Sequence, residues 1–104
     1  MGFSFFKRVF RLKPTASEAS RLLHAKELLL EEQTAVKGFA AMALLAGEGV
    51  PEAQFLVGQA YLTATGVPAN LVEGVRWVMR AAKKNWTKAS FILATLYLHG
   101  LPAE

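Results

Sequence analysis

Two segments of this chain repeat each other 36 positions apart. The first carries Ala53, Phe55, Tyr61 and Leu62, and the second carries Ala89, Phe91, Tyr97 and Leu98 at the equivalent places. A fixed period of roughly 20 to 50 residues is typical of stacked arrays, because each unit buries its apolar face only against a neighbouring unit. The repetition therefore predicts an array fold, and it favours binding over catalysis.

The length and composition fit one folded domain. The chain has 104 residues, of which 53% are hydrophobic, so it can build a packed core. It has no cysteine, which excludes a disulfide framework and a thiolate metal site.

The net charge of +4 is concentrated at the N-terminus. Its carriers are Lys7, Arg8, Arg11 and Lys13. The rest of the chain holds 8 basic and 8 acidic side chains (12 − 4 against 8), so it is formally neutral. This distribution argues against a basic nucleic-acid face on the body of the protein.

Residues 1–14 form a basic amphipathic segment. On a helical wheel, bulky side chains including Phe3, Phe6 and Phe10 fall on one half, opposite Lys7 and Arg11. This pattern is typical of an interfacial helix on an anionic membrane surface. It fits equally well a helix whose Phe side docks on protein, either its own domain or a partner. The segment is too short to span a bilayer.

From residue 15 onward the sequence predicts helices joined by short turns, an all-α fold. We expect helices over Ala16–Gln33, Ala35–Ala46, Glu52–Thr63, Asn70 to about Lys84, and Thr87 to about Gly100. Thr15 with Glu18, and Asn70 with Glu73, have the spacing of capping boxes. Asn85 suits the left-handed position after a helix. Short connections predict antiparallel neighbours and hence stacked α-hairpins.

The pattern over Gly49–Gly100 resembles the Sel-one-like repeat, a relative of the tetratricopeptide repeat. The matching residues are Ala53, Phe55, Val57-Gly58, Tyr61-Leu62, Gly66-Val67-Pro68, Trp77, Ala81-Ala82, Ala89, Phe91, Leu93, Tyr97-Leu98 and Gly100. The resemblance implies an α-hairpin solenoid of about two and a half units. These are a degenerate unit at 15–48, a repeat at 49–86 and a half repeat at 87–104.

Departures from the family pattern point to candidate binding residues. Leu56 and Ile92 occupy equivalent places where the resemblance implies Asn-like side chains, and we expect them to form a stripe across the array. Val72, Met79 and Trp86 follow at intervals of seven residues along the fourth helix. Exposed apolar stripes of this kind mark partner surfaces. An alternative is that the N-terminal Phe-rich segment covers one of them.

Two further departures concern the backbone. Ala64 stands where the family has the first glycine of the turn, and Gly74 replaces a helix alanine. The glycine costs about 1 kcal/mol of helix propensity.

The sequence offers no constellation of catalytic residues. It contains no Asp, its eight Glu are scattered, and His24 and His99 lie far apart without metal-ligand spacing. We therefore expect neither an enzyme, nor a cofactor, nor a metal site. The basic residues of the fourth helix come late, whereas a DNA-reading helix uses its N-terminal end.

Taken together, these features predict a bacterial-type scaffold or adaptor that binds protein partners through the repeat surface. We expect it in the cytoplasm, with residues 3–12 touching the inner face of a membrane if that segment binds lipid. One alternative is a structural subunit of a membrane-associated complex, docked by its Phe-rich N-terminus. A small nucleic-acid-binding regulator is a third hypothesis. The terminal half repeat could also pair with a second copy.

Overall fold

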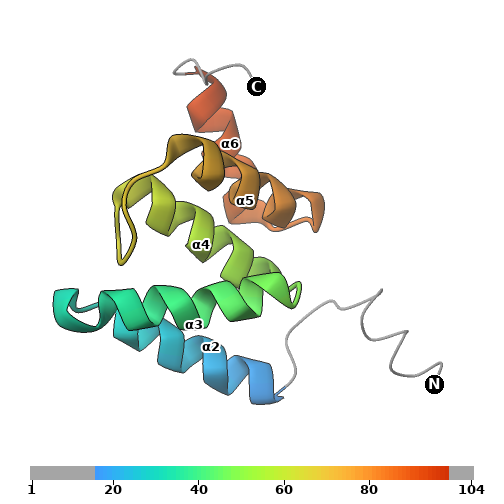
Figure 1. The fold of residues 1–104 in the computed structure, drawn as a ribbon. Helices are drawn as coiled ribbons and strands as arrows, with labels where there is room; N and C mark the ends of the chain where they lie inside the picture. Colours follow the sequence, from blue (N-terminus) through green and yellow to red (C-terminus); the bar gives the residue numbers. More distant parts are fainter. Residues whose placement is uncertain (1–15, 99–104) are drawn as a thin grey trace.

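The computed structural model of the protein describes residues 16–98, and the part it describes is all-α. Its elements are α2 (Ala16–Leu29), the short 3₁₀ helix η1 (Glu32–Thr34), α3 (Ala35–Gly47), α4 (Pro51–Thr63), α5 (Leu71–Lys83) and α6 (Thr87–Leu98). The helices follow one another from α2 at one end of the molecule to α6 at the other (Figure 1). The predicted fold class is confirmed, whereas the solenoid of about two and a half units stays a prediction.

Local signals set the helix boundaries. Pro51 occupies the first turn of α4, where its missing N–H costs nothing. The Asn70 side chain accepts a hydrogen bond from the Glu73 N–H at 3.1 Å and caps α5. The other half of the predicted capping box is replaced, because the Asn70 N–H donates to the Tyr61 carbonyl. Asn85 adopts the predicted left-handed conformation, with φ of 63°.

The sequence does not define where the first predicted helix ends. It ends at Leu29, where the Leu30 N–H donates to the Glu27 carbonyl and tightens the last turn. The Thr34 hydroxyl then donates to the Leu28 carbonyl at 2.7 Å, which holds the turn between α2 and α3 in place. The predicted cap at Thr15 lies outside the described residues.

Two apolar clusters form the core, and each joins helices that are adjacent in sequence. The first combines Leu22, Ala25, Met42, Leu45, Ala46, Val50, Ala53 and Val57, from α2, α3, α4 and the turn before α4. The second combines Phe55, Val78, Ala81 and Ala89, from α4, α5 and α6. Leu56 packs against both clusters, so the side chain of one residue connects the two halves of the core.

Helices α4 and α5 cross in close contact at two glycines. A Cβ atom at Gly58 would lie 2.8 Å from the Gly74 carbonyl oxygen, and one at Gly74 would lie 3.0 Å from the Gly58 oxygen. Neither position has room for a side chain while the helices stay in place. The close crossing explains why position 74 is a glycine, although glycine has a poor helix propensity.

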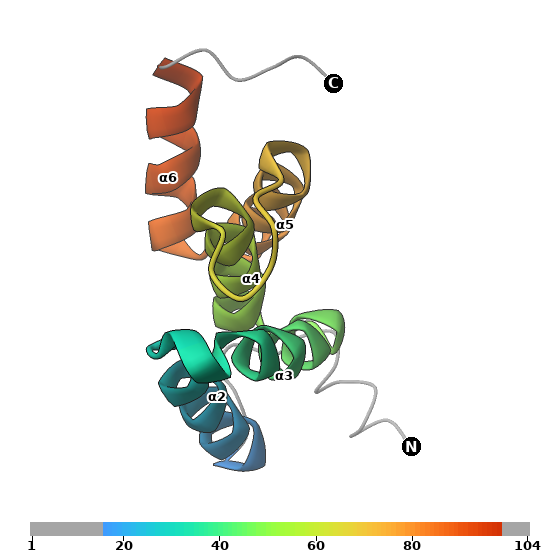
Figure 2. The same ribbon diagram turned by 60° about the vertical axis from the view of Figure 1, so that its left-hand side comes forward.

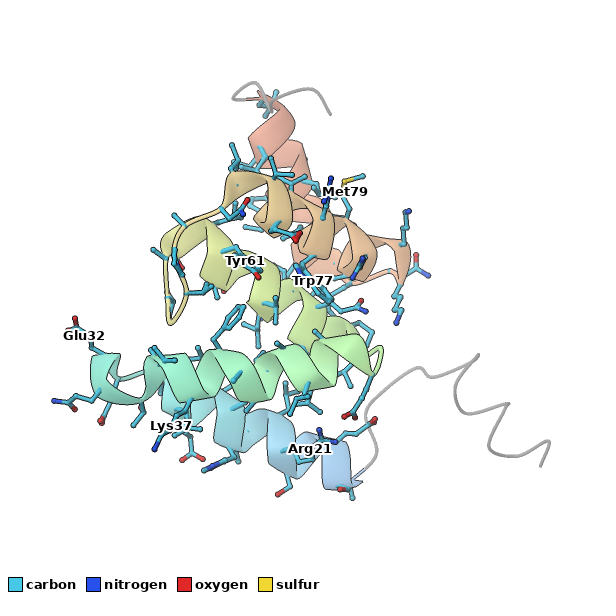
Figure 3. All side chains as sticks on the ribbon, viewed as in Figure 1. Arg21, Glu32, Lys37, Tyr61, Trp77 and Met79 are labelled. Atoms are coloured by element: carbon cyan, nitrogen blue, oxygen red, sulfur yellow. The ribbon has the colours of Figure 1, made fainter. Side chains whose placement is uncertain are left out.

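Tyr61 on α4 and Trp77 on α5 each follow one of these two glycines by three residues (Figure 3). Tyr61 meets Phe39 of α3 edge to face, with ring centroids 5.2 Å apart. The Arg80 guanidinium lies 4.4 Å from the centre of the Trp77 ring, a cation–π contact on α5. Lys84 donates to the Gly49 carbonyl at 2.6 Å and ties the end of α5 to the α3–α4 turn. Arg80 and Lys84 therefore make contacts within the fold.

Candidate partner-binding groove

The first helix of each predicted hairpin lies on the same side of the molecule. Figure 2 shows α2, α4 and α6 toward the left and α3 and α5 toward the right. Two hollows open beside α4 on this side, one toward α2 and one toward α6. We refer to α2, α4 and α6 with these two hollows as the groove.

The α2 side of the groove is a hollow of about 320 Å³. Its lining residues are Lys26, Leu29, Leu30, Leu56, Gln59, Ala60, Thr63 and Thr65. Leu29 and Leu56 are half-buried at this place and pack against the first core cluster. Lys26 forms an ion pair with Glu52, which links α2 to α4 near the hollow. Apolar side chains thus form the hollow, and polar groups lie around them.

The α6 side of the groove is a hollow of about 380 Å³, lined by Phe55, Thr87, Lys88, Phe91 and Ile92. Phe55 is buried, Ile92 is half-buried, and Phe91 is exposed. The side-chain amine of Lys88 carries the only charge among these five lining residues. The apolar lining gives this hollow the character of a site for an apolar side chain.

The structure places Leu56 and Ile92 in neighbouring hollows. Both are half-buried, and both pack against the second core cluster. Leu56 lines the hollow on the α2 side of α4, and Ile92 lines the hollow on the α6 side. The predicted stripe at Leu56 and Ile92 stays a prediction, and both of its side chains are half-buried.

The second predicted set does not form one line. Val72 is exposed on α5. Met79 is half-buried on the same helix (Figure 3). Trp86 lies beyond the end of α5, because the chain reverses at Asn85 and the Trp86 N–H returns to the Ala81 carbonyl. The indole packs against the second core cluster, where its Nε1 is buried without a hydrogen-bond partner within residues 16–98. Binding of a partner at these three residues stays a prediction.

The remaining predicted docking residues, Phe3, Phe6, Lys7, Phe10 and Arg11, lie outside the described residues.

Other parts of the groove were absent from the sequence-based prediction. Lys26, Leu29 and Leu30 lie in residues 15–48, the predicted degenerate first unit, where the sequence shows little of the repeat pattern. The sequence signal for this part of the groove is the run of three leucines from Leu28 to Leu30 at the end of the first helix.

Titratable groups do not gather in the groove. Across residues 16–98 no three His, Cys, Asp or Glu side chains lie close enough to hold a metal ion. Arg21 forms a two-pronged ion pair with Glu48 at 2.8 and 2.9 Å, and this hydrogen bonding raises the pKa of the Arg21 guanidinium. Among the described helices, none is long and apolar enough to cross a membrane.

Comparison with known proteins returns no relative. No family model matches the chain, and no match was found among curated proteins or solved structures.

Proposed function

We propose that this protein is a non-enzymatic adaptor that holds a segment of a protein partner in the groove. The observation that carries the proposal is the pair of hollows beside α4, each with apolar side chains open to solvent. Contiguous exposed apolar surface on a soluble domain is typical of interaction sites. The resemblance to Sel-one-like repeats supports the same conclusion.

The two hollows define what the partner must present. Leu29 and Leu56 shape one, and Phe55 and Ile92 shape the other. A partner segment with two large apolar side chains would fill the two hollows, with one side chain in each. Polar groups on the segment would meet Gln59 and Lys88 at the margins. This division into apolar anchors and a polar rim is the usual arrangement of a protein interface.

A selected peptide provides the test. A displayed library of random peptides is screened against the full chain, and the binders are measured by fluorescence polarisation. We expect Leu56→Glu to weaken binding at least ~30-fold, because it removes an anchor and puts a charge in an apolar hollow. Leu44→Glu is the matched control, since Leu44 is an exposed leucine on α3, outside the groove. It should leave the affinity unchanged.

A second variant guards against misfolding of the first, because Leu56 also supports the core. Gln59 is exposed and lines the α2-side hollow, so Gln59→Arg changes the groove without disturbing packing. Amide chemical shifts of the wild type on peptide addition should change around Leu56, Gln59 and Ile92. Selected peptides whose shifts map elsewhere, and which bind both groove variants normally, would refute the proposal.

We further propose that the adaptor acts in the cytoplasm and that residues 1–13 supply a second docking element at the inner face of a membrane. The charge pattern of that segment supports this, as four basic side chains fall within it. In the alternative role, the protein is a structural subunit of a membrane-associated complex. The same segment then docks on another protein of that complex.

A further inference from the structure

The helices α4 and α6 each carry one charged residue, at the same position of the repeat and with opposite sign. Glu52 is the second residue of α4, and Lys88, which lies 36 positions later, is the second residue of α6. Ala53 and Ala89 follow them directly, so the two positions are equivalent. The charge is therefore reversed between two helices whose sequences otherwise repeat each other.

The charge on α4 is compensated within the fold. The Glu52 carboxylate pairs with the Lys26 amine of α2, beside the α2-side hollow. Glu52 also lies in the first turn of α4, where the helix dipole favours a negative charge. This acidic residue thus stabilises both its own helix and the contact between α2 and α4.

The charge on α6 lacks both kinds of compensation. Lys88 is exposed, and no carboxylate within residues 16–98 forms an ion pair with its amine. It lies in the first turn of α6, where the helix dipole disfavours a positive charge, and that turn contains no acidic residue. The stability of the fold therefore does not account for a lysine at this position.

The position of Lys88 in the groove gives the lysine a use. It lines the α6-side hollow together with the apolar side chains of Phe55, Phe91 and Ile92. An amine beside an apolar hollow is complementary to a segment that presents a large apolar side chain with a carboxylate close to it. At the α2-side hollow the Lys26 amine is already paired, so the demand for an acidic group is confined to the α6 side.

We propose that the partner segment carries an Asp or Glu next to the apolar side chain that fills the α6-side hollow, and that this carboxylate pairs with Lys88. The inference rests on the proposed function, because it assigns the chemistry of the segment held in the groove. The partner's carboxylate does for Lys88 what Glu52 does for Lys26. It also sets the direction of the segment, with the acidic end toward α6.

The N-terminal segment of the same chain is a poor occupant of this hollow. Residues 1–15 contain no acidic side chain and four basic ones. Docking of its Phe side beside Lys88 would bring like charges together, which weakens binding. The charge at the α6 side therefore favours a segment of another protein.

Reversal of the charge tests the pairing. Peptides are selected from a displayed random library on the full chain, and those that bind Leu56→Glu more weakly are kept as groove binders. We expect these peptides to be enriched in Asp or Glu within two residues of a large apolar side chain. Lys88→Glu should weaken their binding at least ~5-fold, because an attractive exposed pair becomes a repulsive one, whereas Lys88→Arg should retain it. Lys37→Glu, at an exposed lysine of α3 outside the groove, is the matched control.

Two measurements separate loss of the pair from loss of the fold. Lys88→Glu puts an acidic residue in the first turn of α6, so its Tm should equal or exceed that of the wild type. Replacing the acidic residue of each peptide by Lys should then restore affinity for Lys88→Glu by at least ~5-fold. A misfolded variant would not regain binding in this way.

Different results would overturn this inference alone or together with the groove. Groove binders without an acidic preference, or with equal affinity for the wild type and Lys88→Glu, would overturn it and leave the groove proposal standing. Peptides whose amide shifts map elsewhere, and which bind Leu56→Glu and Gln59→Arg normally, would overturn both. If Lys88→Glu abolished flotation with phosphatidylglycerol vesicles but left the peptide affinities unchanged, Lys88 would contact lipid, and the inference would be wrong.

Discussion

Replacing glycine by alanine should have opposite effects on the free energy of unfolding at two positions. Gly58 lies at the crossing of α4 and α5, and Gly47 lies outside it. A Cβ atom at Gly58 would lie 2.6 Å from Val78 Cγ2, 2.8 Å from the Gly74 oxygen and 3.0 Å from the Val78 nitrogen. Two of these three atoms belong to the backbone of α5, and the Val78 side chain is fully buried. Gly58→Ala therefore forces the two helices apart.

The magnitude follows from two opposing terms. Overpacking a core costs about 1 to 3 kcal/mol, and backbone contacts place this site at the upper end. Replacing a helix glycine by alanine recovers about 0.5 to 1 kcal/mol of chain entropy. We therefore expect Gly58→Ala to lower the free energy of unfolding by about 2 kcal/mol.

Gly47 is the control for this prediction. It lies in the last turn of α3, and a Cβ atom there would meet nothing within 4 Å. Gly47→Ala should therefore raise the free energy of unfolding by up to about 1 kcal/mol.

Thermal unfolding followed by circular dichroism measures both effects. About 1 kcal/mol corresponds to roughly 4 to 8 °C in Tm for a domain of this size. Gly58→Ala should therefore lower Tm by roughly 8 to 16 °C, whereas Gly47→Ala should raise it slightly. If Gly58→Ala matched or exceeded the Tm of the wild type, the close approach of α4 and α5 would be disproved.

Three further predictions concern the turns and the N-terminus. Ala64 has φ of 57°, so Ala64→Gly should raise the free energy of unfolding by about 0.5 to 1 kcal/mol in urea titrations; a loss of stability would contradict the left-handed assignment. Asn70→Ala should lower it by about 1 kcal/mol through loss of the α5 cap, whereas Asn70→Asp should retain it; equal losses in both would show that the cap is not responsible. Removal of residues 1–13 should abolish flotation with anionic liposomes at low salt, and equal recovery of the full chain with neutral liposomes would refute the membrane hypothesis.

Features set by neighbouring residues could be predicted from the sequence. Pro51, Asn70 and Asn85 act within one helical turn, and their roles at the boundaries of α4 and α5 are confirmed. The end of the first helix illustrates the limit. Its composition continues past Leu29 without a breaker, and the hydrogen bond from Thr34 to Leu28, rather than any local propensity, accompanies its early end.

Features that depend on contacts between helices were harder to predict. Leu56 and Ile92 read as apolar residues at polar positions, but their half-burial depends on how α4 packs between its neighbours. Spacing alone placed Trp86 in line with Met79, although one left-handed residue, Asn85, turns the chain away before it. In the sequence, Gly74 only lowers the helix propensity of its segment. Its role in packing depends on Gly58, which lies opposite it on α4.

Leu56 also affects how the molecule unfolds. Because its side chain packs against both core clusters, neither cluster can lose its packing without exposing part of the other. We expect slow-exchanging amides in α3 and in α5 to open together with a single free energy, unlike long repeat arrays that lose cooperativity and fray unit by unit. A segment bound at Leu56 would then protect both halves against hydrogen exchange, including helices that it never touches.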